Sequence, residues 1–198
     1  MNDSPKSPAG SPPLKVGVLL SGSGRTLQNL LDRAAEGRLA LEAVAVVADR
    51  ENAFGLERAR RAGIPTLYTK DPGASLAFLD EHGAQACCLA GYLRLLPIPE
   101  TWRGRVLNIH PSLLPRHGGK GCYGDRVHAR VLEAGDTESG CTVHLCDDRY
   151  DTGPVLVQKR VPVLPDDTVA TLAARVFEAE CVAYPEAIEL WRRQHLPD

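Results

Sequence analysis

An amide and an imidazole lie two residues apart at the end of one apolar segment, "RVLNIH", residues 105–110. Residues i and i+2 of a strand share one face, so Asn108 and His110 face the same volume. Their N–H groups suit an oxygen that gains negative charge, and His110 also exchanges a proton near neutral pH. Pro111 has no N–H and ends the strand. The pair predicts oxyanion and proton-transfer chemistry, although a strand-end histidine alone is more often structural.

A carboxylate that orients the imidazole is expected from the segment "DDRYDTGP", residues 147–154. Asp151 precedes a Gly-Pro pair in a turn, which would fix the direction of its side chain. Placed beside His110, it would favour the imidazolium and raise the pKa of the ring. Taken alone, Asp151 is equally compatible with a turn-forming role.

Three further titratable residues stand out. His144, inside the expected strand "GCTVHLC", is predicted to be a core or site-wall histidine. His128, on the expected helix "DRVHARVLEAG", is equally compatible with a plain surface position. Glu180 falls on the apolar face of the last expected helix, where a charge is uncommon unless it is paired. A ligand amine or hydroxyl and an internal arginine are equally good partners for Glu180.

A glycine-rich turn, "SGSGRT" at residues 21–26, links the first expected strand to the first expected helix. Glycine permits positive φ and close backbone approach, and a helix N-terminus presents N–H groups with partial positive charge. The turn lacks the P-loop lysine, and the dinucleotide pattern would require glycine where Leu27 stands. The pattern therefore favours a phosphate monoester, with a ligand-free turn as an equal alternative.

Apolar segments of strand length alternate with helical patterns along the chain. Strands are expected at 14–20, 41–49, 65–69, 84–91, 105–110, 140–146 and 154–163, and helices at 26–37, 52–63, 73–83, 125–135 and 167–194. Strands of continuous apolar residues are typical of a parallel sheet covered on both faces. The last two strands are expected to form an antiparallel extension. Ligands of such open α/β sheets bind beyond the carboxyl ends of the strands.

The 198 residues fit a single domain, expected at 14–198, with its phosphate site in the N-terminal half and catalytic residues in the C-terminal half. Residues 1–13 are rich in proline and serine, which predicts a disordered tail rather than a signal peptide. A formal net charge of −2 favours neither nucleic acid nor membrane as a partner.

Six cysteines occur, none in a CxxC pair and most within apolar segments. The spacing does not fit a zinc site, and buried thiols of a reducing compartment are the expectation. A cytoplasmic location follows from this interpretation.

Several motifs together resemble the phosphoribosylglycinamide formyltransferase family, the folate-dependent enzymes of purine biosynthesis. The matching segments, between Leu14 and Tyr184, are "VLLSGSGRTLQNLL", "NAFGLERARRAG", "LAGYLRLL", "VLNIHPSLLP", "GDTESGCTVHL", "DTGPVLVQ" and "AYP". The resemblance implies a Rossmann-like formyltransferase fold that acts as a monomer or homodimer without a metal. It also implies transfer of the formyl group of 10-formyltetrahydrofolate to the primary amine of glycinamide ribonucleotide.

The resemblance also implies roles for individual residues. Asn108 and His110 would stabilise the tetrahedral oxyanion, and Asp151 would hold His110 protonated and help to move the amine proton. The residues that match the ribonucleotide-binding positions are Gly22, Ser23, Gly24, Arg25, Thr26 and Glu180. The residues that match the folate-binding positions are Leu93, Arg94, Leu95, Leu96, Asp147, Asp148 and Asp151.

Two segments depart from the commonest pattern of that family. The segment "RHGGKGCYGDRVH" is longer than in many members and is interpreted as a mobile loop beside the ribonucleotide site, with Lys120 as its one functional contact. The stretch after residue 70 lacks an arginine that contacts folate in many members, and Lys70 is its candidate substitute.

Three alternatives compete with this interpretation. A formyltransferase for an amino-sugar nucleotide would need to bind a pyrophosphate, which the single-phosphate turn does not favour. A formyltetrahydrofolate hydrolase usually carries an additional N-terminal regulatory domain, for which the residues before Leu14 are too few. A binding module without chemistry would not be expected to keep Asn108, His110 and Asp151 together.

Overall fold

The computed structural model of the protein describes residues 12–196. The predicted N-terminal tail therefore lies outside the described residues up to position 11. The chain forms two compact units: unit 1 extends to Pro97 and includes the end of the chain from Glu189, and unit 2 comprises Ile98–Ile188. The single domain expected from the sequence stays a prediction, and each unit is described by itself.

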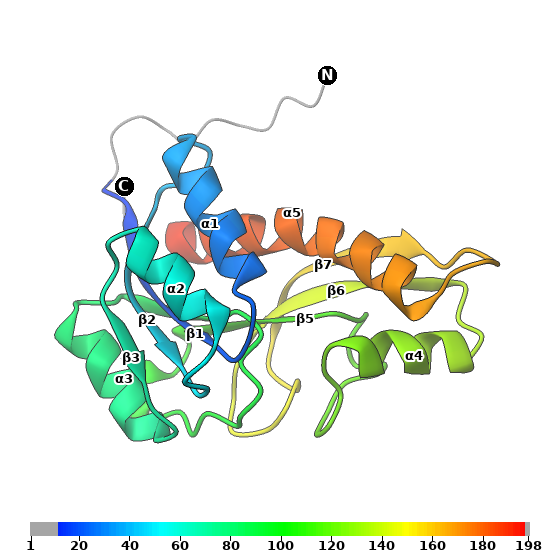
Figure 1. Ribbon diagram of the computed structural model, residues 1–198, viewed down its shortest axis with the longest axis horizontal. Coiled ribbons are helices and arrows are strands. Elements are labelled where there is room, and N and C mark those ends of the chain that lie inside the picture. Colours follow the sequence, from blue (N-terminus) through cyan, green and yellow to red (C-terminus); the bar gives the residue numbers. More distant parts are fainter. Residues whose placement is uncertain (1–11, 197–198) are drawn as a thin grey trace. The chain divides into compact units, whose positions relative to one another are not determined.

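Unit 1 is built on parallel strands in the order β3-β2-β1-β4. The strands are β1 (Leu14–Leu20), β2 (Leu41–Ala48), β3 (Thr66–Tyr68) and β4 (Ala86–Leu89). The helices that connect them are α1 (Arg25–Ala35), α2 (Phe54–Arg61) and α3 (Pro72–Glu81). Each strand of this set is thus joined to the next one along the chain by a helix, which returns the chain to the same end of the sheet (Figure 1).

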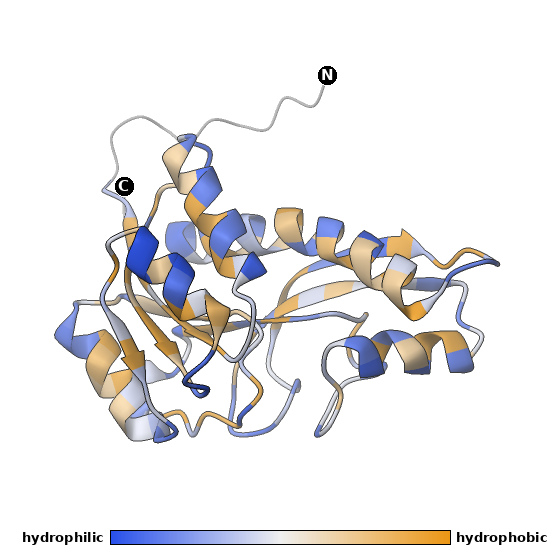
Figure 2. Ribbon diagram, viewed as in Figure 1, coloured by the Kyte–Doolittle hydropathy of each residue, from blue (hydrophilic) through white to orange (hydrophobic). Residues whose placement is uncertain are grey.

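The apolar sequence of these strands explains their central place in unit 1. Six of the seven β1 residues are buried, all except Lys15, and Figure 2 shows β1 and β2 mostly in the hydrophobic colours. The helices instead carry one apolar face each, with Leu27 and Leu30 buried on α1. Gly37 ends α1 in a left-handed conformation, with φ 68°, as its position in the sequence predicts.

Unit 2 contains antiparallel strands flanked by two helices. Its elements are the short 3₁₀ helix η1 (Glu100–Trp102), β5 (Val106–His110), α4 (Asp125–Glu133), β6 (Glu138–Leu145), β7 (Val155–Pro162) and α5 (Val169–His195), whose last turns belong to unit 1. Strand β6 pairs antiparallel with both β5 and β7. In Figure 1 the three strands lie between α4 and α5.

Every strand and helix expected from the sequence is present, with ends that differ by at most two residues. The 3₁₀ helix η1 was not expected, because three residues carry no periodic signal. The predicted fold class is confirmed: an α/β fold with a mostly parallel sheet, flanking helices and antiparallel C-terminal strands. The antiparallel pairing of the last two expected strands is confirmed as well.

None of the six cysteines is in a disulfide, and four of them are buried. Within residues 12–196 no helix is long and apolar enough to cross a membrane. The same residues contain no cluster of histidine, cysteine or acidic side chains suited to hold a metal ion.

Candidate active site

The pairing of β5 with β6 places four polar side chains at one end of these strands. Asn108 lies directly opposite His144, and His110 lies opposite Thr142. Residues that pair across two strands share a face, as do residues two apart on one strand. His110, Thr142 and His144 are at most 4% exposed, so this polar group is enclosed by protein.

Asp151 reaches this group from the turn between β6 and β7. Its backbone is left-handed, with φ 58°, which is rare for a non-glycine residue and typical of a turn. Asp147 stabilises the same turn, because its carboxylate accepts hydrogen bonds from the Arg149 N–H (2.9 Å) and the Thr152 hydroxyl (2.8 Å). The turn therefore holds Asp151 in a defined direction, as the sequence predicts.

The Asp151 carboxylate faces both residues of the "NIH" pair. Its Oδ2 lies 3.5 Å from His110 Nδ1, and its Oδ1 lies 3.5 Å from Asn108 Nδ2. Both distances exceed those of a strong hydrogen bond, so the carboxylate is not closely bonded to either side chain. Gly119 N–H donates to Oδ2 at 2.9 Å and holds the carboxylate in place.

His110 has its second ring nitrogen engaged by the backbone. Its Nε2 lies 3.1 Å from the carbonyl oxygen of His117, which can only accept a hydrogen bond. Nε2 therefore carries a proton in either charge state. In the neutral ring, Nδ1 is then the proton acceptor, and it is the nitrogen that faces Asp151.

His144 is more closely involved in the site than a wall histidine. Its Nδ1 donates to the Leu145 carbonyl (2.9 Å), which leaves Nε2 to accept from the Asn108 amide at 3.0 Å. The same Nε2 lies 3.7 Å from Asp151 Oδ1. His144 therefore orients the Asn108 amide. The sequence places His144 two residues from Thr142 on β6, but only the register between β5 and β6 shows that it meets Asn108.

The expected direction of the His110 pKa is wrong. Burial lowers the pKa of His110 below its ordinary value, and this effect outweighs the opposing influences of the Asp151 charge and the His117 hydrogen bond. The carboxylate lies too far away at 3.5 Å to compensate for the lost hydration of an imidazolium. His110 is therefore favoured as a neutral imidazole.

Asp151 remains an anion in this setting. Burial raises its pKa, but the neighbouring His144 and His110 rings and the Gly119 N–H, which donates to Oδ2, together lower the pKa below that of an ordinary carboxyl group. The site thus pairs a carboxylate with a neutral imidazole.

His128 is buried, so its possible surface position is ruled out. It is 4% exposed on α4, and its Nδ1 has no hydrogen-bond partner within the described residues. Burial lowers the pKa of His128, and His110 acts on it in the same direction. The sequence does not predict the burial of His128, because a single histidine on a short helix does not show which face of the helix packs against the rest of the protein.

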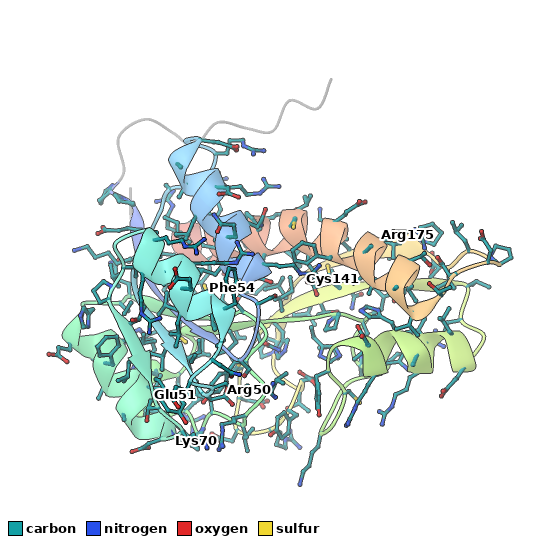
Figure 3. The ribbon with its side chains drawn as sticks, in the orientation of Figure 1. Arg50, Glu51, Phe54, Lys70, Cys141 and Arg175 are labelled. Carbon is teal, nitrogen blue, oxygen red and sulfur yellow. The ribbon has the colours of Figure 1, made fainter. Side chains whose placement is uncertain are left out.

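Glu180 lies half-buried on α5, on the side that carries the buried residues Val176 and Tyr184. Burial, followed by the negative charge of Glu180, raises the pKa of Cys141 to about 12. Glu180 therefore faces β6, where Figure 3 labels Cys141. Its predicted contact with a ribonucleotide remains a prediction.

The glycine-rich turn of unit 1 leads into a helix N-terminus that no side chain caps. Gly24 is the N-cap of α1 with φ 71°, and no side chain caps the first turn of the helix. The turn lies against α2: a Cβ on Gly24 would stand 2.6 Å from the Cα of Gly55. Glycine is therefore required at position 24 for both conformation and space.

Arg58 supports this turn and was not predicted. Its Nε donates to the Ser23 carbonyl (2.9 Å), its Nη1 donates to Gln28 (3.0 Å), and its guanidinium lies 5.0 Å from the Phe54 ring centre. Figure 3 labels Phe54 at the start of α2. Only the packing of α2 against the turn reveals that Arg58 brings positive charge there.

The residues predicted to bind folate differ in their exposure. Leu96 is buried and Leu95 is 40% exposed, while the Leu93 N–H donates to Ser21 Oγ (3.0 Å) at the glycine-rich turn. Arg94 Nε pairs with the buried Asp49 at 3.2 Å. Lys70, labelled in Figure 3, is exposed in the same unit.

In unit 2, Asp148 is exposed and lies 3.5 Å from Arg103. Asp147, as described above, serves the turn that holds Asp151. The long loop at 116–125 is tied to the site through His117 and Gly119, whereas Lys120 is exposed.

Comparison with known proteins identifies the family of the chain. Residues 14–188 match the family model described as formyl transferase, and the chain therefore belongs to the formyl transferase family. Within that family it is similar to phosphoribosylglycinamide formyltransferases. The chloroplastic enzyme of that name from Arabidopsis thaliana is 36% identical, over 92% of this chain and 69% of its own length.

The chain is also similar to a solved structure and to a part of larger, trifunctional proteins. The crystal structure of glycinamide ribonucleotide transformylase 1 from Symbiobacterium toebii has a TM-score of 0.83 and 42% identity, and the match covers 92% of this chain and 89% of that one. The trifunctional purine biosynthetic protein adenosine-3 from Chironomus tentans is 42% identical over 90% of this chain. The chain spans 14% of the length of that trifunctional protein.

Proposed function

We propose that the protein transfers the formyl group of 10-formyltetrahydrofolate to the primary amine of glycinamide ribonucleotide. The products are formylglycinamide ribonucleotide and tetrahydrofolate. The observation that carries the proposal is the group formed by Asn108, His110 and Asp151, which brings an amide donor, a neutral imidazole nitrogen that can accept a proton and a carboxylate together. Family membership and the similarity to enzymes of that name support it.

The chemistry begins with the amine. The lone pair of the neutral amine attacks the formyl carbon, and the carbonyl electrons move onto the oxygen. The proton that the amine loses passes to His110 Nδ1, directly or through water beside Asp151. The imidazolium and the Asn108 amide then stabilise the oxyanion. When the oxyanion collapses, the bond from carbon to N10 breaks and N10 receives the proton.

The environment of His110 suits this order of events. A histidine with a lowered pKa is neutral when the amine arrives, so Nδ1 can accept a proton. The ionised Asp151, 3.5 Å away, stabilises the positive ring that this transfer creates. The resting site therefore has a base, and the intermediate has a charged donor.

Binding of the ribonucleotide is assigned to the glycine-rich turn and Glu180. The N–H groups at the start of α1 and the Thr26 hydroxyl would hold the phosphate, with Arg25 and the nearby Arg58 adding positive charge. Glu180 would contact the same substrate. Folate binding is assigned to Leu93, Arg94, Leu95, Leu96, Asp147, Asp148 and Asp151. The absence of a metal, a cytoplasmic location and a monomeric or homodimeric state stay predictions.

Release of tetrahydrofolate tests this function. Purified protein is mixed with 10-formyltetrahydrofolate and either glycinamide ribonucleotide, an amino-sugar nucleotide or no amine. Release only with glycinamide ribonucleotide is expected. Equal release without any amine would identify a hydrolase, and a preference for the sugar nucleotide would identify the other transferase class.

A further inference from the structure

The segment Arg116–Gly119 contacts both members of the His110–Asp151 pair. The carbonyl of His117 accepts from His110 Nε2 at 3.1 Å, and the Gly119 N–H donates to Asp151 Oδ2 at 2.9 Å. Between them, Gly118 passes so close that an added Cβ would lie 3.3 Å from the Asp151 Cβ. The positions of the two catalytic side chains therefore depend on how firmly this segment is held.

One carboxylate anchors the segment. Asp136, in the turn after α4, has a side chain only 7% exposed. Its Oδ2 lies 2.7 Å from His117 Nε2, and its Oδ1 pairs with Arg116 Nη2. The Asp136 N–H itself bonds to the Val131 carbonyl at the end of α4 (3.3 Å). Asp136 thus connects the segment to a helix.

The backbone of His117 needs such an anchor. Its φ of 55° is a left-handed conformation that costs a non-glycine residue free energy unless its surroundings hold it there. The ring of His117, 16% exposed, is held by Asp136, and this contact fixes the orientation of the adjoining carbonyl. That carbonyl is the group that keeps a proton on His110 Nε2.

We propose that Asp136 is a positioning residue for formyl transfer, which acts through the His117 backbone to hold His110 in the tautomer that leaves Nδ1 facing Asp151. Without the anchor, His110 can rotate or carry its proton on Nδ1, and the nitrogen that must accept the amine proton is then blocked. This inference deepens the proposed function and rests on it. Asp136 itself does not touch the reacting atoms in this account.

The groups that act on His110 come from each neighbouring segment. They are Asp151 from the turn after β6, His144 on β6, His117 on the anchored segment and His128 on α4. Replacing Asp136 leaves all four in the chain. A change in the His110 tautomer in such a variant is therefore attributable to the orientation of the His117 carbonyl.

The test uses Asp136→Asn with Asp167→Asn as a matched control. Asp167 is also a buried carboxylate paired with an arginine of unit 2, Arg175, at 2.6 Å, and its hydrogen bonds all lie within residues 164–175. Nitrogen chemical shifts of the imidazoles, read by NMR in the substrate-free protein, report which ring nitrogen of His110 is protonated. Steady-state kinetics then separate kcat from KM.

In the wild type the proton of neutral His110 is expected on Nε2. Asp136→Asn should give a mixture of tautomers and lower kcat by about 10- to 100-fold with little change in either KM, since misplacement of a catalytic group has effects of this size. Asp167→Asn should change neither reading. A wild-type tautomer and kcat in Asp136→Asn, or equal changes in both variants, would overturn the proposal.

A second variant covers the case in which Asp136→Asn does not fold. His117→Gly removes the ring that Asp136 holds, while glycine adopts the left-handed backbone without strain. The same mixture of tautomers is expected, and an unchanged His110 spectrum would contradict the proposal. The NMR reading needs no substrate, so a wild-type protein inactive toward glycinamide ribonucleotide would refute the proposed function and leave this inference to be decided separately.

Discussion

His110 and Asp151 form an ionised carboxylate beside a neutral imidazole, an arrangement produced by burial on one side and hydrogen bonding on the other. The pair is productive only while the imidazole can both accept and return a proton. Their individual contributions to turnover can therefore be measured by removing each group in turn.

His110→Ala and Asp151→Asn should each lower kcat by about 10² to 10³, the typical effect of losing one oxyanion donor or its partner. The KM for glycinamide ribonucleotide should change little, because neither group is among the residues assigned to binding of the ribonucleotide. Steady-state kinetics at saturating folate measure both constants, and Asp166→Asn, an exposed aspartate of unit 2, is the control. Near-normal turnover in His110→Ala would mean that the chemistry takes place elsewhere.

The pH at which His110 titrates follows from the direction in which its pKa is shifted. A His110 pKa below the ordinary 6.5 means that the neutral base persists as pH falls through that value. Asp151 stays ionised in the same pH range, because its pKa lies below that of an ordinary carboxyl group. Titration of the His110 ring signals by NMR in the substrate-free protein should therefore have its midpoint below pH 6.5, and a midpoint at higher pH would contradict a neutral resting histidine.

Among the elements, the turns that follow the strands position the reactive groups. The glycine-rich turn after β1 and the turn between β6 and β7 each contain a glycine that packs directly on backbone: Gly24 on Gly55, and Gly153 on the Leu145 carbonyl. Side-chain rearrangement cannot relieve either contact. Substitutions of these glycines thus test whether the backbone of each turn must keep its position, rather than the role of a single side chain.

Gly153→Ala would place a Cβ 1.8 Å from the Leu145 oxygen and should force the turn that carries Asp151 out of position. We expect a loss of at least about 2 kcal/mol in the free energy of unfolding, as for other overpacked sites, together with reduced kcat. Urea denaturation measures the first quantity. Gly73→Ala on helix α3, where alanine is the better helix former, is the control, and equal stability in both variants would argue against a strained turn.

Thr26→Val tests the phosphate turn without disturbing its glycines. Loss of one hydrogen bond to a charged phosphate is worth about 1.5 to 3 kcal/mol, so the KM for glycinamide ribonucleotide should rise by roughly 10- to 100-fold. The KM for folate should not change. Thr137→Val, at an exposed threonine of unit 2, serves as the matched control. An unaltered KM for the ribonucleotide in Thr26→Val would contradict phosphate binding at this turn.

Much of this architecture could be predicted from the sequence because local patterns determine it. Apolar runs such as Leu14–Leu20 define strands, and the spacing of Asn108 and His110 defines a shared face. The contributions of His144, Arg58 and Asp136 could not be predicted, since each depends on strand register or on packing between distant segments. The wrong direction for the His110 pKa has the same origin: sequence indicates a neighbouring carboxylate, but not that His110 is only 4% exposed or that the two groups are 3.5 Å apart.

For the molecule as a whole, the chain matches both separate enzymes and a part of trifunctional proteins. It covers 89% of the Symbiobacterium toebii chain and 14% of the Chironomus tentans protein at the same 42% identity. The proposed transfer therefore depends on residues within this chain, and it should proceed in the isolated protein without other activities of the trifunctional relatives.

The most direct measurement follows the formyl carbon itself. Purified protein is given 10-formyltetrahydrofolate labelled with ¹³C in the formyl group, together with glycinamide ribonucleotide, and the products are analysed by NMR. The account predicts that the label appears as a formamide on the ribonucleotide amine, in equal amount to the tetrahydrofolate released, and that His110→Ala abolishes most of this signal. Label recovered as free formate would contradict it.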